Sequence, residues 1–543
     1  MTTPISALGD QYVRERTKRN PISATYLGVT EDFDGTGDFG PEGQATEAEA
    51  DRRALAELNG LEPVNRDDRV AAAHMRERLT TNLDAYDSGE WKRSLRAPYG
   101  MVQSLRNYLD MGGRTTPEQW ELATLRLEGM PGLLEGWIDC LKVGLADGVT
   151  AARRQAVAAA DQAQGYLDIN SFDSIVSEYG DGPLKSRLEA GVAAATSGYA
   201  ELVRFLREDY APRATETDGV GAERYEVASR QCLGDVIDAH DAYNWGWEEL
   251  RRLEAEMAVE AEKVLPGAEL GEVIEHLNRT QSVEGEDAYL EWLKELHATA
   301  LDRLDGTHFD IDPRIKDVDV VLVHAKGAGS PYYTPPSEDL SRLGRTWWPV
   351  ADRTRFNIWN EATTVYHEGV PGHHLQYGQI NVVDMPRYTR NNRVSGNSEG
   401  WALYAEKLAD ELGWHDEPGR RLGMLKASAM RAARVVIDIG VHLDLPIPAS
   451  EVSRHGPRWN FDVAVEVLRD RGRVSQHRLY PEIVRYFGWP GQAITYKLGE
   501  RAWLAARDEA KARPGFDLKM WHTDALNLGP VGLGVLTDFL RDL

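Results

Sequence analysis

Apolar side chains recur at three- and four-residue intervals through most of the first two thirds of the chain. That spacing places them on one face of a helix, and it predicts a succession of amphipathic helices. The predicted helices cover residues 47–58, 66–86, 117–143, 149–167, 183–207 and 233–264. A break rich in Pro, Gly and polar residues at 211–221 predicts a boundary between an N-terminal helical lobe, residues 1–215, and a second lobe, residues 216–543.

The pattern changes between residues 318 and 359. Residues 318–323 form a β-branched run, 327–336 read as a Gly/Pro/Tyr loop, and 355–359 alternate as a short strand does. We therefore expect a small sheet that packs beside the segment following residue 359 and offers an edge to an extended peptide. A purely structural hairpin is the alternative. The predicted fold class is mainly α: a large, two-lobed helical protein, like a metallopeptidase, with one small sheet.

Composition narrows the possible partners. The chain of 543 residues carries 62 basic and 87 acidic residues, a formal charge of −25, which argues against nucleic acid or an anionic membrane as partner. Cys140 and Cys232 are far apart and are expected to be free thiols in a reducing compartment. The first 20 residues lack an apolar core segment and no run of 18 apolar residues occurs, so we expect a cytoplasmic protein without a membrane span.

The strongest chemical signal lies at residues 366–374, where three histidines and a glutamate fall within nine residues. A second glutamate, Glu399, opens the next apolar helical pattern. Two imidazoles, one carboxylate, an open position for water and a spare glutamate as base make up a catalytic zinc site. The segment predicts one divalent ion, zinc, per chain.

The spacing of the histidines requires a break in the helix. On a regular helix His367 and His373 would lie about 120° apart and roughly 9 Å apart along the axis. Nitrogens that share a zinc ion are only about 3–3.5 Å apart. Pro371 and its neighbouring glycines supply a kink or bulge that can bring the two rings together. We expect His373 to be the second ligand, with His374 as the competing candidate.

Three glutamates complete the predicted centre. Glu368 follows His367 directly and is the candidate general base; an ordinary helix glutamate is the alternative. Glu399 is the candidate third ligand, expected in the first turn of a helix capped by Asn397 or Ser398, where a contact with the helix dipole alone is the alternative. Glu406, two turns further along, is expected to support the ligands or to replace Glu399.

Two further segments contain candidate site residues. Arg434, Asp438 and His442 share one face whether residues 434–442 form a helix or a strand. An Asp–His pair in an apolar segment suits a protonated imidazole that stabilises an oxyanion. A buried structural salt-bridge network is the alternative.

In the other segment, Pro490-Gly491 predicts a turn into a helix. This turn would place Gln492, Tyr496 and Arg485 or Lys497 near one surface. Tyr496 could donate to the oxyanion and a basic side chain could hold a substrate carboxylate, although a tyrosine in a helix is more often part of the core.

Several motifs resemble those of one bacterial family. They are HEGVPGHHLQ at 367–376, EGWALYAE at 399–406, DIGVH at 438–442, PGQAITYK at 490–497 and PISATYLG at 21–28. The chain resembles the family catalogued as domain of unknown function 885. The resemblance implies a mostly helical protein with a metal cleft between lobes. Its site is similar to that of helical zinc peptidases related to thimet-type oligopeptidases, whose third ligand is a glutamate roughly two dozen residues past the second histidine; the interval from His373 to Glu399 is 26 (399 − 373).

Together these residues predict a zinc-dependent hydrolase, and within that class a peptidase. His367, His373 and Glu399 hold the metal, Glu368 takes a proton from the attacking water, and His442 or Tyr496 stabilises the oxyanion. The expected substrate is a peptide or a small amide. Two other functions stay open: hydrolysis of non-peptide amides or esters, and a metal-free binding protein on the same scaffold.

Overall fold

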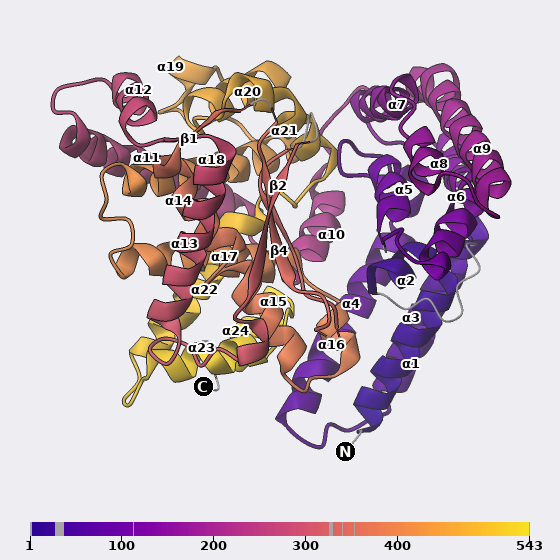
Figure 1. Ribbon diagram of the computed structural model, residues 1–543, viewed down its shortest axis with the longest axis horizontal. Helices are drawn as coiled ribbons and strands as arrows, with labels where there is room; N and C mark the ends of the chain where they lie inside the picture. Colours follow the sequence, from indigo (N-terminus) through magenta and orange to yellow (C-terminus); the bar gives the residue numbers. More distant parts are fainter. Residues whose placement is uncertain are drawn as a thin grey trace.

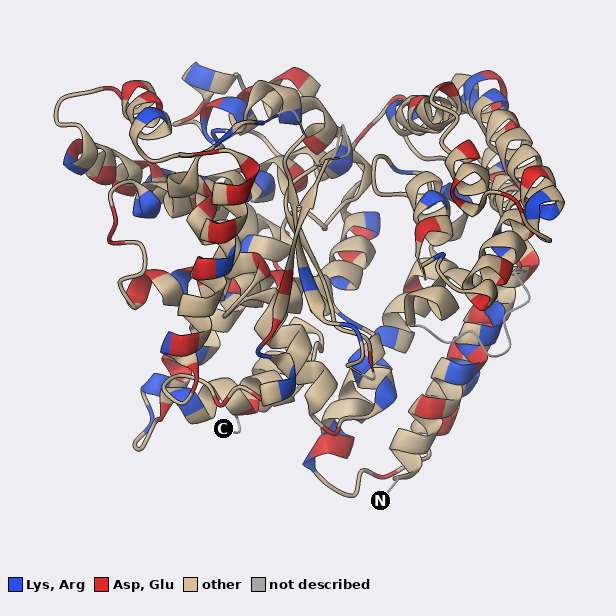
Figure 2. Cartoon of the chain, viewed as in Figure 1, with Lys and Arg blue, Asp and Glu red and all other residues tan. Residues whose placement is uncertain are grey.

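The computed structural model describes residues 3–27, 37–111, 113–324, 329–338, 340–351 and 353–541. Helices take up 69% of the chain and strands 4%, which confirms the mainly α fold class. The helices lie in two groups, side by side (Figure 1). Charged side chains are spread along the outward faces of the helices, as amphipathic patterns require (Figure 2).

The first group contains the N-terminal helices. Its helices are α1 (Pro4–Arg19), α2 (Pro21–Leu27), α3 (Pro41–Leu58), α4 (Arg66–Asp87), η1 (Glu90–Arg93), α5 (Met101–Asp110), α6 (Pro117–Asp147), α7 (Arg153–Asp168), α8 (Asp173–Tyr179), α9 (Lys185–Arg204), η2 (Phe205–Tyr210) and η3 (Ala211–Arg213). The start of α6 agrees with the prediction because Thr116 and Gln119 form a capping box ahead of Pro117. The long α6 and α9 pack together over a core that extends from Phe39 to Ala211.

The second group contains most of the rest of the chain. Its helices are α10 (Ala222–Leu233), α11 (Ala239–Val264), α12 (Leu270–Thr280), α13 (Glu286–Leu304), η4 (Pro313–Ile315), α14 (Ile358–Glu368), α15 (His373–Val382), α16 (Arg387–Asn391), α17 (Ser395–Glu411), α18 (Arg420–His442), α19 (Val452–His455), α20 (Phe461–Asp470), α21 (Gln476–Gly488), α22 (Thr495–Lys511), α23 (Leu518–Asn527) and α24 (Leu533–Leu540). The largest core fills this group, and the predicted boundary at 215/216 falls between η3 and α10.

The predicted helix 233–264 begins later than expected. Gly234 has a left-handed backbone (φ +65°) that ends α10, and α11 starts only after Asp238, whose side chain caps it. An added Cβ at Gly234 would lie 2.3 Å from Gly532, so a close backbone contact reserves this position for glycine. The periodicity of the sequence continues through this break, which is why the prediction missed it.

Five short strands lie next to α13 and α15. In the larger sheet the order is β2 (Val318–Val323), β4 (Gly344–Pro349), β3 (Tyr332–Thr334); β2 and β4 are parallel, with Val318 opposite Gly344, and β3 is antiparallel to β4. β1 (Val283–Glu284) pairs with β5 (Arg355–Phe356). Strand 318–323 was predicted correctly. The predicted strand 355–359 is wrong after Phe356, because α14 begins at Ile358 and buries Trp359 in the helical core.

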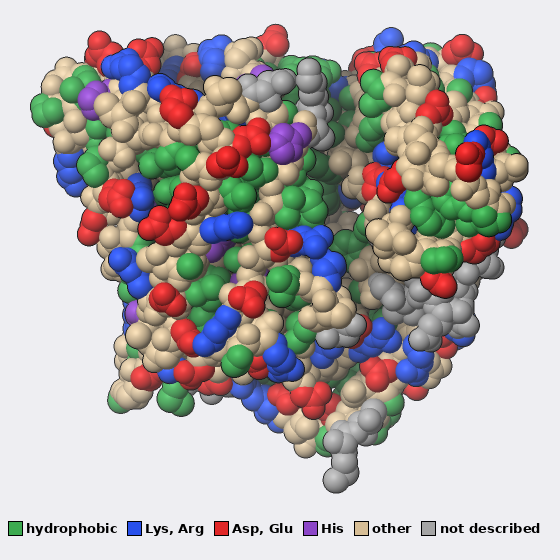
Figure 3. Space-filling view, viewed as in Figure 1, with side chains coloured by type: hydrophobic (Ala, Val, Ile, Leu, Met, Phe, Trp, Pro, Cys, Tyr) green, Lys and Arg blue, Asp and Glu red, His purple; other side chains and the backbone are tan. Residues whose placement is uncertain are grey.

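The predicted loop 327–336 contains β3, while its residues 327 and 328, like Gly28 of the motif at 21–28, lie outside the described residues. The two helical groups meet where α1 packs on α16 and α4 packs on α10 and α24. Above these contacts the surface is hollowed between the groups (Figure 3). No helix in the described part of the chain is long and apolar enough to cross a bilayer.

Candidate metal centre

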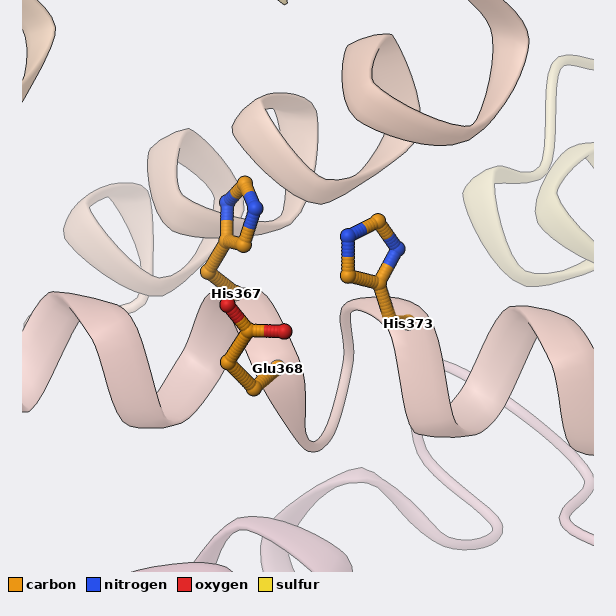
Figure 4. A group of neighbouring side chains, drawn as sticks. All are labelled: His367, Glu368 and His373. Carbon is orange, nitrogen blue, oxygen red and sulfur yellow. The ribbon is translucent and has the colours of Figure 1, made fainter. Parts of the chain in front are cut away.

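The Gly-Pro-Gly segment separates two helices. α14 ends at Glu368 and α15 starts at His373, so the break is a full interruption instead of the kink or bulge expected within one helix. An added Cβ at Gly372 would lie 2.0 Å from the His367 carbonyl oxygen, and one at Gly369 would lie 2.1 Å from the His297 ring. Only glycine fits this tight turn. The turn brings the rings of His367 and His373 to a centroid distance of 4.8 Å (Figure 4).

Glu399 joins the two imidazoles from α17. Its Oε2 lies 3.5 Å from His367 Nε2 and 3.6 Å from His373 Nε2. Ligand atoms arranged tetrahedrally at the usual zinc distances of about 2.0–2.2 Å are about 3.3–3.6 Å apart. Two nitrogens and one carboxylate oxygen are also a donor set that zinc prefers. The Glu399 oxygen thus lies at a ligand-to-ligand distance from each imidazole, and the three side chains, called the histidine site below, are candidate ligands of a divalent ion.

Close pairing within the histidine site sets the pKa values of its side chains. Burial lowers the pKa of His367, but the hydrogen bonds with Glu399 and Glu406 outweigh this and raise it to about 9. Burial likewise favours neutral Glu399, yet its bonds with His367 and His373 hold the pKa of that carboxyl well below its usual range. The Glu399 carboxylate is thus held in its charged form between the two imidazoles.

Glu368 lies beside the two histidines. One ligand atom from each of His367, Glu368 and His373 can be chosen so that all lie within 4.8 Å of one another. The Glu368 side chain points toward the space between the rings (Figure 4). Burial, and next to it the charge of Glu399, raises the pKa of Glu368, while the nearby histidines lower it. Glu399 bridges both rings, so Glu368 is left as a neighbour able to handle a proton.

Glu406 fixes the orientation of His367. Its Oε1 lies 2.8 Å from His367 Nδ1, so Nδ1 carries the proton and Nε2 is left for a ligand. Thr363 donates to the other oxygen at 2.5 Å, and Arg431 Nη2 lies 3.1 Å from Oε1. Burial opposes the charge, but Arg431 and the bonds with His367 and Thr363 lower the pKa of Glu406 to about 2.

Sequence reasoning missed Arg431. It lies three residues before Arg434 on the same face of α18, and this spacing was the signal available in the sequence. Its side chain is buried, and its Nε and Nη1 have no hydrogen-bond partner among the described residues.

His374 does not belong to the metal centre. Its Nε2 lies 2.8 Å from the Ile315 carbonyl oxygen and its Nδ1 lies 3.0 Å from the Tyr333 hydroxyl, so both nitrogens are engaged elsewhere. Burial lowers its pKa to about 4. His373, by contrast, turns Nε2 toward Glu399 and leaves Nδ1 without a partner among the described residues. The geometry resolves the choice between the two histidines in favour of His373.

The expected cap ahead of Glu399 is wrong. α17 starts at Ser395, so Glu399 lies in the second turn and the dipole contact is weaker than expected. Asn397 is buried inside the helix, where it accepts from Gln376 and donates to the Val531 carbonyl. Ser398 bonds back to the Val394 carbonyl at 3.4 Å. Tertiary partners on α15 and before α24 thus replace the capping role.

Tyr496 lies in the first turn of α22, close to the histidine site. Burial raises its pKa, and the charge of Glu399 adds to the increase, so the phenol lies near that carboxylate. The guanidinium carbons of Arg434 and Arg431 lie 4.7 and 6.0 Å from the centre of its ring. Tyr496 is half-buried, and its hydroxyl makes no hydrogen bond to a described residue.

Asp438 and His442 correct another expectation. Both lie on α18, but Asp438 accepts from the Tyr225 hydroxyl (2.6 Å) and the Gly491 amide (3.0 Å) instead of pairing with His442. His442 Nε2 lies 3.0 Å from the Tyr486 carbonyl, and burial lowers its pKa to about 4. His442 is therefore a neutral, structural imidazole, and the prediction of a protonated His442 is wrong.

The remaining candidates separate into two places. Arg485 donates to Gln492 (2.6 Å) and to Glu482 (2.8 Å), beside Arg434. Lys497 instead pairs with Glu249 at 2.9 Å and with Glu500, in a cavity of about 440 Å³ lined by α11, α17, α18 and α22. Lys497 was therefore wrongly grouped with Tyr496.

Comparison with known proteins identifies the family. The family model described as "Bacterial protein of unknown function (DUF885)" matches residues 21–540, so the chain belongs to this family. Two solved structures share the fold: a "putative lipoprotein" from Colwellia psychrerythraea (22% identity, 99% of this chain and 98% of that one, TM-score 0.83) and one of unknown function from Shewanella oneidensis (16%, 99% and 100%, TM-score 0.76). No curated protein matches.

Proposed function

We propose that this member of the DUF885 family is a zinc-dependent hydrolase that cleaves peptides. One observation carries the proposal. Glu399 Oε2 lies 3.5 Å from His367 Nε2 and 3.6 Å from His373 Nε2, and a second buried glutamate, Glu368, lies beside the two rings. A divalent ion held there would supply a Lewis acid that polarises a carbonyl and acidifies water. The site resembles that of the helical zinc peptidases in its ligand types and order.

The side chains of the protein supply the proton transfers. Glu368 takes a proton from the attacking water while the water oxygen bonds to the amide carbonyl carbon. As the carbon–nitrogen bond breaks, Glu368 passes that proton to the leaving amine. Tyr496, near Glu399, donates its hydroxyl to the developing oxyanion. Glu406 and Arg431 keep the His367 ring in position during these steps.

Metal analysis and hydrolysis together test the proposal. Purified protein, stripped with chelator and reloaded, should bind one zinc per chain. His367→Ala should weaken zinc binding at least 100-fold, whereas His240→Ala, an exposed histidine on α11, should leave it unchanged.

Glu368→Gln should keep the metal and lose about 10²–10⁴-fold in turnover, the usual contribution of a general base. The substrates are a peptide library together with small amides and esters. Zinc that binds equally well to the His367→Ala protein would overturn the metal centre. Cleavage of amides or esters without cleavage of peptides would replace the peptidase assignment with the broader one.

A further inference from the structure

Next to the histidine site, two buried arginines share one carboxylate. Arg434 and Arg485 are 4% and 5% exposed, and both donate from Nη2 to Glu482 Oε2, at 3.0 and 2.8 Å. Arg478, at 3.9 Å from the same Glu482, adds further positive charge. Asp438 bonds to Tyr225 and Gly491 and to neither arginine. Charged side chains this deeply buried are normally balanced, so the excess positive charge favours an anion.

The guanidinium of Arg434 is the part of this arginine pair that faces Tyr496. Arg434 uses Nε on the Tyr486 hydroxyl (2.8 Å) and Nη2 on Glu482, while its Nη1 makes no hydrogen bond to a described residue and is not sealed from solvent. Its guanidinium lies over the Tyr496 ring at 4.7 Å. The Tyr496 ring also lies 6.0 Å from the guanidinium carbon of Arg431, which pairs with Glu406 beside His367, so Arg434 lies one side chain beyond the residues that hold His367.

We propose that Arg434, with the charge of Arg485 behind it, binds the terminal carboxylate of a peptide, so that the protein cleaves near the free C-terminus of its substrates. The inference rests on the proposed hydrolase. Arginine binds carboxylates with a directed fork of donors. Water adds to the carbonyl carbon, the carbon–nitrogen bond breaks, and the proton goes to the amine of the C-terminal fragment. That fragment leaves with its carboxylate from Arg434.

The N-terminal lobe bounds this end of the site. Tyr99, which follows η1, has its ring centre 6.0 Å from the Arg485 guanidinium carbon. A Cβ at Gly329, on the connection between β2 and β3, would lie 3.7 Å from the Tyr99 hydroxyl. Tyr99 of the N-terminal lobe thus approaches both the arginine pair and the connection before β3. A chain that ends there fits better than one that continues.

The test compares peptides that differ only at the C-terminus. A randomised pool of acetylated tripeptides is prepared as free acids, as C-terminal amides, and as amides with Glu in the last position. Retention on immobilised, zinc-loaded Glu368→Gln protein measures binding, and digestion by wild type measures kcat/KM. We expect the free acids to exceed both amide pools at least 30-fold in each measurement.

Variants assign the preference to Arg434. Arg434→Gln should remove most of the free-acid advantage and change the amide rates less than 3-fold; Arg434→Lys should restore part of it. Arg501→Gln, which removes an exposed arginine on α22 that pairs with Asp241, should change the ratio less than 2-fold. Melting temperature and zinc content check that each variant is folded and metal-competent.

The outcomes separate the two proposals. Equal cleavage and equal retention of acids and amides overturn the carboxylate site and leave the hydrolase intact. Retention of acids through Arg434 without cleavage of any pool supports the carboxylate site and overturns the hydrolase. If the Glu-terminated amides match the free acids, the anion is an acidic side chain and the C-terminal assignment is wrong.

Discussion

Two buried charged clusters, one around Lys497 on α22 and one around His367 on α14, differ in how completely they are paired. The Lys497 cluster, formed by Glu249, Lys497 and Glu500, is closed: the ammonium group meets both carboxylates and the Ser428 hydroxyl. The histidine site is open, with His373 Nδ1 and two Arg431 nitrogens unpartnered among the described residues. Buried polar groups are normally satisfied, so the unsatisfied cluster is the one that indicates function.

The largest expected effect on folding comes from the closed cluster. Lys497→Met leaves Glu500 buried without its cation and leaves Glu249 paired with Arg252 alone, so we expect the free energy of unfolding to fall by about 3–5 kcal/mol. Zinc stoichiometry should not change. Urea denaturation of the variant and of Lys497→Met/Glu500→Gln measures this effect, and the double variant should recover part of the loss. Zinc loss at full stability would contradict the division between the clusters.

In the open cluster, the expected effect is on metal affinity. Glu406→Gln keeps the shape of the side chain but loses the charge that fixes His367, so zinc affinity should fall about 10–100-fold. Competition with a chromophoric chelator measures the zinc affinity of each variant. Glu500→Gln, in the Lys497 cluster, is the matched control and should bind zinc as wild type does. Equal affinities for both variants would mean that Glu406 does not orient the ligand.

The last expected effect is a pH dependence of stability at Asp438, which lies in neither cluster. Burial raises its pKa to about 7, above its unfolded value near 3.9. The folded state therefore holds an extra proton between about pH 4 and 7, and stability falls as pH rises through this window. The wild type should lose up to about 1.4 kcal/mol of stability per pH unit in this window, and Asp438→Asn should remove that loss. Identical stability–pH curves for both proteins would refute the shift.

The sequence predicts where helices and strands lie better than it predicts which way each helix is rotated about its axis. Thr116 with Pro117 and the β-branched run 318–323 act locally, so their helix and strand were placed correctly. The rotation of α22 is set by the close approach of Gly499 to Gly400, where an added Cβ would lie 2.2 Å from the Gly396 carbonyl. Tyr496 faces Arg434 while Lys497 meets Glu249, and no sequence pattern indicates which neighbour each side chain meets.

The site itself was predicted in part. The Gly-Pro-Gly break predicts that the rings of His367 and His373 lie close together, because an unbroken helix would hold them apart. His442 was misjudged because its spacing from Asp438 reveals the shared face but not the carbonyl that takes up its nitrogen. Arg431 was overlooked because its partner Glu406 comes from another helix.

Anomalous diffraction at the zinc edge, from crystals of the zinc-loaded protein, tests the central claim most directly. The account predicts one peak within about 2.0–2.2 Å of His367 Nε2, His373 Nε2 and a Glu399 carboxylate oxygen. A protein that shows no peak there at saturating zinc, or that holds its zinc on other side chains, would contradict it.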